Sequence, residues 1–195
     1  IMEKIFIIII SYLLGSIPFG VLVSRQKGID LQRTGSGNIG ATNVLRTAGK
    51  GAAVLTLIGD MMKGSLSIFL AKKFLNEPWI ALSGIAVMLG HIFPLFLKFR
   101  GGKGVATAFG TILIYSPVVA VISVFLWAMV VYIFRYSSLG AIVTFLSLPV
   151  IIFILDPDKN KIIFSMFVTS IIILRHKENI VRLFKRTENK IGERS

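Results

Sequence analysis

Residues 104–134 read GVATAFGTILIYSPVVAVISVFLWAMVVYIF, a run without a single charged side chain. As one helix this run would be about 47 Å long, whereas the hydrocarbon core of a bilayer is about 30 Å thick. It is therefore too long for one comfortable span and too short for two full ones. Pro117 has no backbone donor and restricts Ser116 before it, so we predict a break at Tyr115-Ser116-Pro117, between a short span and a full one.

The rest of the chain has the same character. Mean hydropathy is +0.81, with 54% of residues apolar and only 16% charged. A soluble domain of this size could not cover so much apolar surface with so few polar residues. We predict an all-α integral membrane protein in which residues 1–195 form one domain. The first apolar run is too long for the core of a signal peptide and is expected to remain as a span. Further apolar stretches, the second of them interrupted by charge, lie at 5–24, 51–71, 78–97, 136–155 and 162–174.

The distribution of Lys and Arg favours seven transmembrane helices, with the N-terminus outside and the C-terminus cytoplasmic. With seven spans, one side carries 16 of these residues and the other carries 5. With six spans, the basic tail after Arg175 would lie outside, against the positive-inside rule. The weakest span is 162–174, which is short enough for a re-entrant segment; Lys161 and Arg175 can lengthen it by snorkelling.

Composition also excludes several function classes. The net charge of +13 is explained by basic loops beside anionic lipid, and part of it can attract anionic substrates. The basic residues flank spans and form no separate domain, so no nucleic-acid partner is predicted. The chain has no cysteine, and its two histidines lie in no acidic cluster, so we expect no metal site and infer no cofactor.

The first candidate motif is the polar stretch GSGNIGATNVLR at 35–46. Its glycines fit the pattern G-x-G-x-x-G, but a dinucleotide site needs a preceding strand, and here a basic loop between spans precedes them. Glycines and the start of a helix still let backbone N–H groups approach a phosphate, and an arginine can bind it with two hydrogen bonds. The alternative is a flexible linker. The predicted site residues here are Ser36, Gly37, Asn38, Gly40, Thr42, Asn43 and Arg46.

The second motif surrounds Lys103, a point charge suited to phosphate, which lies among Gly101, Gly102 and Gly104. A basic glycine loop at a membrane boundary can equally be topological. His91 precedes this loop inside an apolar run, where an ionisable side chain is expensive. It is either a site residue or a helix-packing hydrogen bond, and the sequence leaves both open.

The third motif is in the basic tail, where His176 and Asn179 would share one face of a helix. The cations around them are explained by an amphipathic interfacial helix, so these two are kept as candidate site residues. Within the second apolar stretch, Asp60 and Lys63 lie three residues apart. A structural ion pair is the simpler explanation for them.

Together these segments resemble the PlsY family of bacterial acyl-phosphate:glycerol-3-phosphate acyltransferases. The resemblance covers essentially the whole chain; one departure is Arg186, where the family often has glycine two residues before an acid, here Glu188. The segments that carry it are Gly15-Ser16-Ile17-Pro18-Phe19-Gly20, 35–46, Asp60 with Lys63-Gly64, 90–107 and His176-x-x-Asn179-x-x-Arg182-Leu183.

The resemblance implies seven spans, a location in the bacterial cytoplasmic membrane and a site at its cytoplasmic face. It implies transfer of a fatty acyl group from acyl phosphate to the 1-hydroxyl of glycerol 3-phosphate, giving lysophosphatidic acid and inorganic phosphate. The expected partners are these two substrates and the lipid bilayer, with no obligate protein partner. The alternative class is a membrane transporter of an organic phosphate, although transporters favour midplane sites and internal repeats.

We predict that the 37–43 loop holds acyl phosphate, while Ser36, Arg46, Lys103 and Asn179 hold glycerol 3-phosphate. No H-x-x-x-x-D motif follows either histidine. Because a mixed anhydride is already activated, the substrate's own phosphate can take the proton, and His91 and His176 are the alternative bases.

Overall fold

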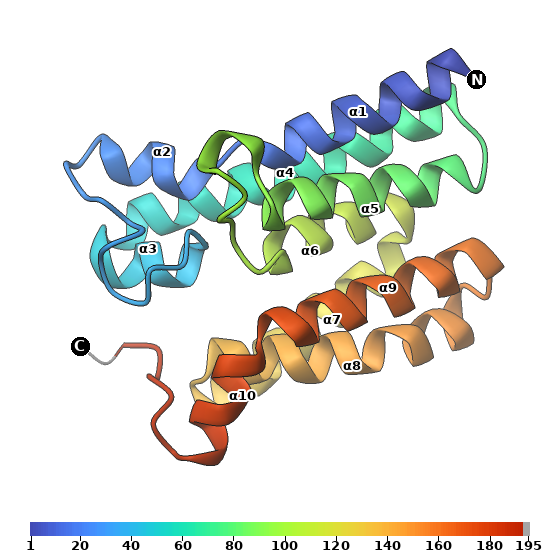
Figure 1. Ribbon diagram of the computed structural model, residues 1–195. Coiled ribbons are helices and arrows are strands. Elements are labelled where there is room, and N and C mark those ends of the chain that lie inside the picture. The colour runs from blue at the N-terminus through green and yellow to red at the C-terminus, as the bar shows by residue number, and fades with distance from the viewer. Residues whose placement is uncertain (193–195) are drawn as a thin grey trace.

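The computed structural model describes residues 1–192, and in that range the protein is helical with no β-strand (Figure 1). The helices run roughly parallel or antiparallel to one another, and short turns connect them. The elements in chain order are α1 (Met2–Ser16), α2 (Phe19–Arg25), α3 (Ala41–Thr47), α4 (Lys50–Phe74), α5 (Trp79–Ile92), the 3₁₀ turn η1 (Leu95–Leu97), α6 (Val105–Tyr115), α7 (Pro117–Phe134), α8 (Ser137–Leu155), α9 (Lys159–Arg175) and α10 (Lys177–Phe184).

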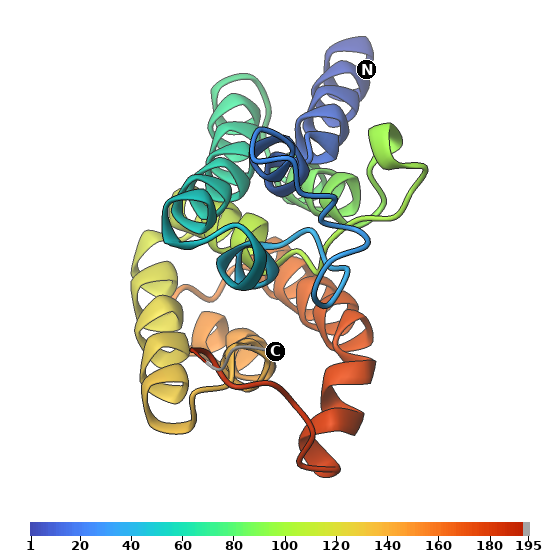
Figure 2. The ribbon, with the colours of Figure 1, turned by 90° about the vertical axis from the view of Figure 1, so that its left-hand side faces the viewer.

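The helices form two groups that meet at α6. One group contains α1, α4 and α5, and the other contains α7, α8 and α9 (Figures 1 and 2). Helix α6 packs against α4 on one side and α7 on the other. Its Phe109 ring lies 5.3 Å from the Phe145 ring of α8, measured between centroids. The short predicted span, α6, thus joins both halves of the core, and α5 also packs directly against α9.

Many large apolar side chains point outward, as a protein surrounded by lipid requires. Phe125, Tyr132 and Phe153 are each at least 66% exposed. Within the described residues, five segments are long and apolar enough to cross a bilayer: Met2–Arg25, Lys50–Phe74, Trp79–Leu97, Pro117–Phe134 and Ser137–Leu155. Helix α6 has 11 residues and α9 has 17, so both fall short of that length.

The predicted break in residues 104–134 is confirmed. Helix α6 ends at Tyr115, and α7 begins at Pro117, where a missing N–H costs a helix nothing. Two further breaks were not predicted. Pro18 separates α1 from α2, and Pro94 follows the end of α5, so the uncharged runs 5–24 and 78–97 each contain an interruption.

The interruption at Pro18 explains the charged pair inside α4. Lys63 Nζ lies 2.8 Å from Asp60 Oδ1, which confirms the structural ion pair. The same ammonium donates a hydrogen bond of 3.0 Å to the carbonyl of Ile17, at the point where α1 ends. The lysine therefore serves a carbonyl at the α1–α2 break as well as the carboxylate.

Polar contacts join four helices at the place where α6 and α8 end and where α7 and α9 begin. Asp156 accepts hydrogen bonds from Ser116 and Lys161, both of 2.6 Å. Lys161, which was expected to snorkel, instead neutralises this carboxylate. Asp158 caps α9 by accepting from two of its first N–H groups.

Candidate active site

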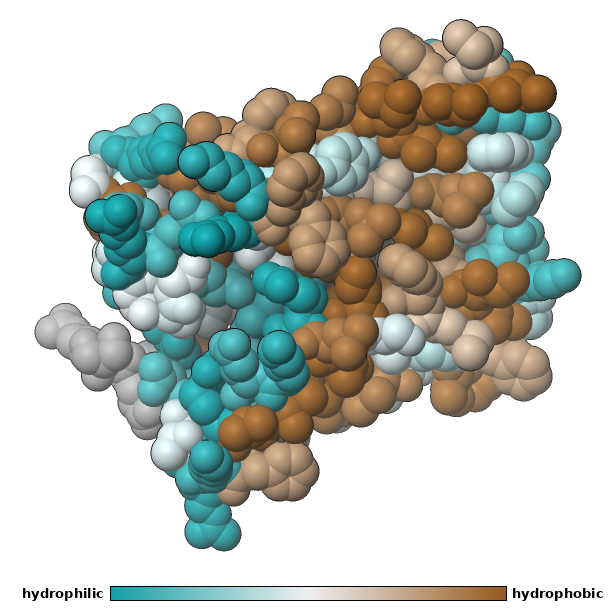
Figure 3. Space-filling view, viewed as in Figure 1, coloured by the Kyte–Doolittle hydropathy of each residue, from teal (hydrophilic) through white to brown (hydrophobic). Residues whose placement is uncertain are grey.

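The three sequence motifs gather at one end of the molecule, the left-hand end in Figure 1 and the face toward the viewer in Figure 2. We call this region the polar end. It comprises loop 26–40, α3, loop 93–104, α10 and the tail 185–192. Figure 3 shows hydrophilic side chains concentrated there, whereas the middle of the molecule is predominantly hydrophobic.

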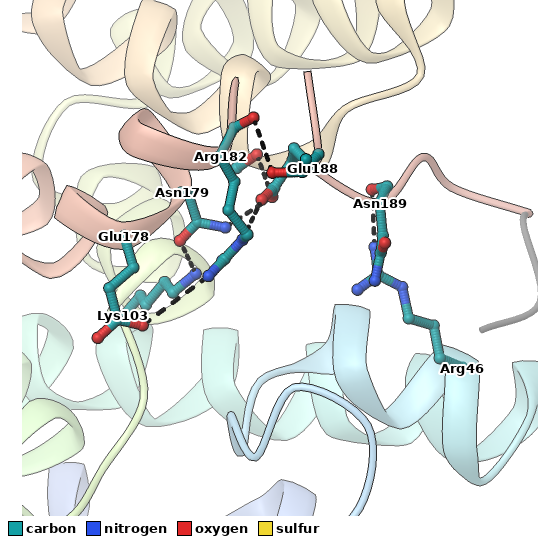
Figure 4. A network of polar contacts seen from close by, with 9 residues as sticks. Arg46, Lys103, Glu178, Asn179, Arg182, Glu188 and Asn189 are labelled. Carbon is teal, nitrogen blue, oxygen red and sulfur yellow. Dashed lines mark hydrogen bonds and ion pairs between the residues drawn. The ribbon is translucent and has the colours of Figure 1, made fainter. Parts of the chain in front are cut away.

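Lys103 and Asn179, predicted from motifs far apart in the sequence, are direct neighbours. The Lys103 ammonium donates a hydrogen bond to Asn179 Oδ1, and Asn179 Nδ2 donates to Glu188 Oε1 over 2.6 Å (Figure 4). Burial lowers the pKa of Lys103 to about 8, although Glu188 opposes the shift. The structure thus places a weakly solvated cation beside a carboxamide, a suitable arrangement for binding phosphate.

Glu188 is the centre of this network, and it was not among the residues predicted for the site. Its carboxylate accepts hydrogen bonds from Ser138 and Arg182, each of 2.7 Å, in addition to Asn179. Its side chain is only 8% exposed. Burial alone would raise the pKa of Glu188, but these donors hold it below its usual value. The signal available in the sequence was an acidic residue within a basic tail.

Arg46 reaches the same tail from α3. Its Nη2 donates a hydrogen bond of 2.9 Å to the carbonyl of Asn189, the residue after Glu188 (Figure 4). Its Nε is buried and has no hydrogen-bond partner among residues 1–192. Thr42 of α3 is joined to Ser137 of α8 through their hydroxyls at 3.1 Å. The tail and α8 therefore bring the first motif close to the network around Lys103.

Asn43 shapes the first motif from within. Its Oδ1 accepts a hydrogen bond from the Ser36 N–H, and its Nδ2 donates to the carbonyls of Thr34 and Asn38, over 2.9–3.0 Å. Its side chain is buried. The amide that was expected to contact substrate is therefore committed to holding the loop, and the Ser36 hydroxyl remains at the exposed surface.

Some of the backbone donors expected for phosphate are also committed. The Gly37 N–H bonds to the Thr34 carbonyl, and the Gly40 N–H bonds to Asn38 Oδ1. Gly40 precedes α3, so the predicted helix start is confirmed. The N–H groups of Ala41 and Thr42 lie in the first turn of α3, where a helix supplies no acceptor for them.

The glycines around Lys103 are required for packing and do not leave an open loop. A methyl group on Gly101 would overlap the His91 carbonyl, and one on Gly102 would overlap the His91 ring. Gly104 has a φ of +87°, a conformation that favours glycine. These residues let the loop lie directly against the end of α5, and this fixes the direction from which Lys103 projects.

Both histidines are buried. His91 Nδ1 lies 3.5 Å from Asp60 Oδ1, and its other nitrogen faces Gly102, so the ring is covered on both sides. His176 Nδ1 is 2.8 Å from the Ile172 carbonyl, and because a carbonyl only accepts, this nitrogen carries the proton. Burial and the nearby Lys103 cation lower the pKa of His176 to about 4. His176 is therefore neutral at pH 7.

The turn before Glu188 contains Arg186, the residue noted above as a departure from the family pattern. Arg186 has a φ of +58°, a left-handed conformation that favours glycine, and the turn still directs Glu188 inward. Across residues 1–192, no three His, Asp or Glu side chains are grouped as metal ligands.

The fold and this site define a multi-span integral membrane protein with a cluster of cations and hydrogen-bonding side chains at one end. A profile described as Glycerol-3-phosphate acyltransferase matches residues 5–186. Curated relatives with that name include one from Desulforamulus reducens, 47% identical over 97% of this chain and 96% of its own length. Another, from Geotalea daltonii, is 42% identical over 96% and 97%. The chain belongs to the glycerol-3-phosphate acyltransferase family.

Solved structures agree. The crystal structure of PlsY (YgiH), an integral membrane glycerol 3-phosphate acyltransferase, matches in its glycerol 3-phosphate form with a TM-score of 0.94 and 40% identity. That match covers 97% of this chain and 96% of the other. The lysophosphatidic acid form of the same protein matches with a TM-score of 0.92 and 39% identity.

Proposed function

We propose that this enzyme takes its acyl group from acyl phosphate and transfers it to the 1-hydroxyl of glycerol 3-phosphate. The hydroxyl oxygen attacks the acyl carbonyl carbon, the bond from that carbon to the phosphate oxygen breaks, and inorganic phosphate leaves. The product is lysophosphatidic acid, so the reaction is the first step of phospholipid synthesis. The whole chain, 1–195, would act as one acyltransferase domain; residues 193–195 lie outside the described part.

The observation that carries the choice of donor is the state of the two histidines. His91 is covered by Asp60 and Gly102, and His176 has a pKa of about 4. Neither is suited to remove a proton from an alcohol near pH 7. An enzyme without a strong base needs an activated donor. A mixed anhydride is such a donor, and its departing phosphate can accept the proton.

Glycerol 3-phosphate would bind where the cations converge. Lys103 and Arg46 would contact its phosphate, with the Ser36 hydroxyl and the Asn179 amide as neutral partners. The acyl phosphate would lie at the 37–43 loop. Because Asn43 and the N–H groups of Gly37 and Gly40 hold that loop together, the available donors are the N–H groups of Ala41 and Thr42.

The proposed location is the bacterial cytoplasmic membrane, with seven spans, the N-terminus outside and the polar end at the cytoplasmic face. Helices α6 and α9 would be the two short spans. The distribution of Lys and Arg supports this orientation. Soluble glycerol 3-phosphate would then enter from the cytoplasm, while the acyl chain of the donor remains in the bilayer. The proposal requires no metal, cofactor or obligate protein partner.

The test is acyl transfer by the purified protein in detergent or lipid. Radiolabelled glycerol 3-phosphate would be offered with palmitoyl phosphate or with palmitoyl-CoA, using wild type and Lys103→Ala. We expect labelled lysophosphatidic acid from palmitoyl phosphate only, and its loss in the variant. Product from palmitoyl-CoA would contradict the donor. No product from either, with folded protein that takes up glycerol 3-phosphate in vesicles, would favour the transporter alternative.

A further inference from the structure

A second basic region lies at the polar end, outside the Lys103 network. It is a pocket of about 510 Å³ between loop 26–40, the loop after α5 and the end of α9. Arg33, Arg100 and Arg175 line it, one from each of these segments. Lys103 and Asn179 do not. Gly37 and Gly101 also line it, so the pocket adjoins the 37–43 loop, but its three arginines have no role in the proposed acyl transfer.

The charge of this pocket is strongly positive. Among the described residues, the one carboxylate that lines it belongs to Asp30, which lies 3.4 Å from Arg33 Nε. Arg175 Nη2 also donates a hydrogen bond of 3.3 Å to the Gly101 carbonyl, so this guanidinium is held at the pocket wall. Three guanidinium groups facing a single carboxylate leave a net positive site, and guanidinium geometry matches phosphate oxygens.

The border of the pocket carries exposed apolar side chains, which binding of a soluble anion would not require. Phe99 lines the pocket and is 57% exposed, and Phe96 in η1 is 61% exposed. Figure 3 shows hydrophobic side chains over this loop, next to the hydrophilic polar end. Phe side chains beside Lys and Arg are typical of segments that lie at the membrane interface.

We propose that this pocket binds the phosphate of an anionic membrane phospholipid, with the lipid chains lying against Phe99 and Phe96. Arg33 is 88% exposed, so an isolated phosphate from solution would gain little from it through water. A bilayer presents phosphates at high local density beside the same arginines. The lipid would bind the loop that ends at Lys103, so this site links membrane composition to the loop that carries the catalytic cation.

The test measures lipid retention by the full-length protein in detergent, with native mass spectrometry, and its readout is independent of the acyl donor. Phosphatidylglycerol, phosphatidylcholine and inorganic phosphate would be titrated separately. The variant is Arg33→Gln with Arg100→Gln. The matched control is Arg25→Gln with Lys50→Gln, which removes the same charge from exposed positions that do not line the pocket.

We expect wild type and the control to retain phosphatidylglycerol in preference to phosphatidylcholine, and the pocket variant to bind it about tenfold more weakly, a loss of about 1.4 kcal/mol. Phe99→Ala should weaken retention of the lipid and leave binding of inorganic phosphate unchanged. Equal losses in both double variants would show general surface attraction and overturn the proposal. Inorganic phosphate that displaces the lipid at equal concentration would overturn the lipid as occupant.

Discussion

Asn179 donates a hydrogen bond from Nδ2 to Glu188 Oε1 over 2.6 Å, and its Oδ1 consequently faces the Lys103 ammonium. A carboxamide can place either its oxygen or its N–H₂ group toward a partner. Here the partner is a carboxylate, which only accepts hydrogen bonds, so the N–H₂ group must face it. Glu188 comes from the tail and Asn179 from α10, so the orientation of the amide that we propose binds glycerol 3-phosphate depends on how the tail folds back.

Replacing Glu188 with Gln is the sharpest test of this arrangement. The amide keeps the shape but removes the charge, so Arg182 loses its partner and Asn179 its fixed direction. Hydrogen bonds to charged groups are worth about 1.5–3 kcal/mol, so we expect KM for glycerol 3-phosphate to rise about tenfold or more. The control is Glu178→Gln, because Glu178 is 78% exposed and 3.9 Å from Arg182. Equal kinetics in the two variants would contradict a positioning role.

Lys103→Ala should reduce kcat/KM by about 10²–10³-fold, because the enzyme loses the cation that would hold the phosphate of glycerol 3-phosphate and so place its hydroxyl for attack. The helical content and the melting temperature should remain near those of wild type. Lys50→Ala, an exposed lysine at the same end, serves as control. Wild-type kinetics in Lys103→Ala would remove this residue from the site.

The pH profile should reflect the same lysine. Lys103 is charged below its pKa of about 8 and loses its proton above it. Binding of a phosphate dianion therefore weakens as pH rises through 8, and kcat/KM, which reports the free enzyme, should fall on this alkaline limb. Lys103→Arg should move that limb upward by more than a unit, since guanidinium does not titrate there. An unchanged limb in Lys103→Arg would assign it to another group.

His176→Ala tests whether the substrate phosphate accepts the proton. With a pKa of about 4, His176 is a poor base, so kcat should fall by less than about 100-fold. His91→Ala should act mainly on stability, because its ring supports Gly102. The measurement is steady-state kinetics with melting curves. A loss of about 10⁴-fold in kcat at constant KM, in either variant, would identify that histidine as the base.

Gly101→Ala should destabilise the protein and displace Lys103, since the added methyl group would meet the His91 and Ile92 carbonyls. We expect a lower melting temperature and lost activity. Gly51→Ala is the matched control, because no described residue lies within 4 Å of its added methyl group and alanine favours the helix by about 0.5–1 kcal/mol. Equal melting temperatures in the two variants would show that the loop does not depend on this close packing.

Much of the fold could be predicted from residue order alone. The absence of charge over 104–134 and the proline at 117 determined a break that the structure places between Tyr115 and Pro117. Asp60 and Lys63, three residues apart, determined an ion pair, because no other local partner can neutralise either in lipid. Such features depend on neighbours within one or two helical turns, which a sequence displays directly.

The candidate site could be predicted only in part from residue order. Lys103 and Asn179 were selected by residue type and motif, and tertiary packing decided that they touch. Packing also turned Asn43 inward, covered His91 with Gly102 and brought three arginines, from two loops and the end of α9, into one pocket. Residue order reveals which chemistry is present, whereas the direction of each side chain depends on contacts between segments far apart in the chain, which only the folded bundle supplies.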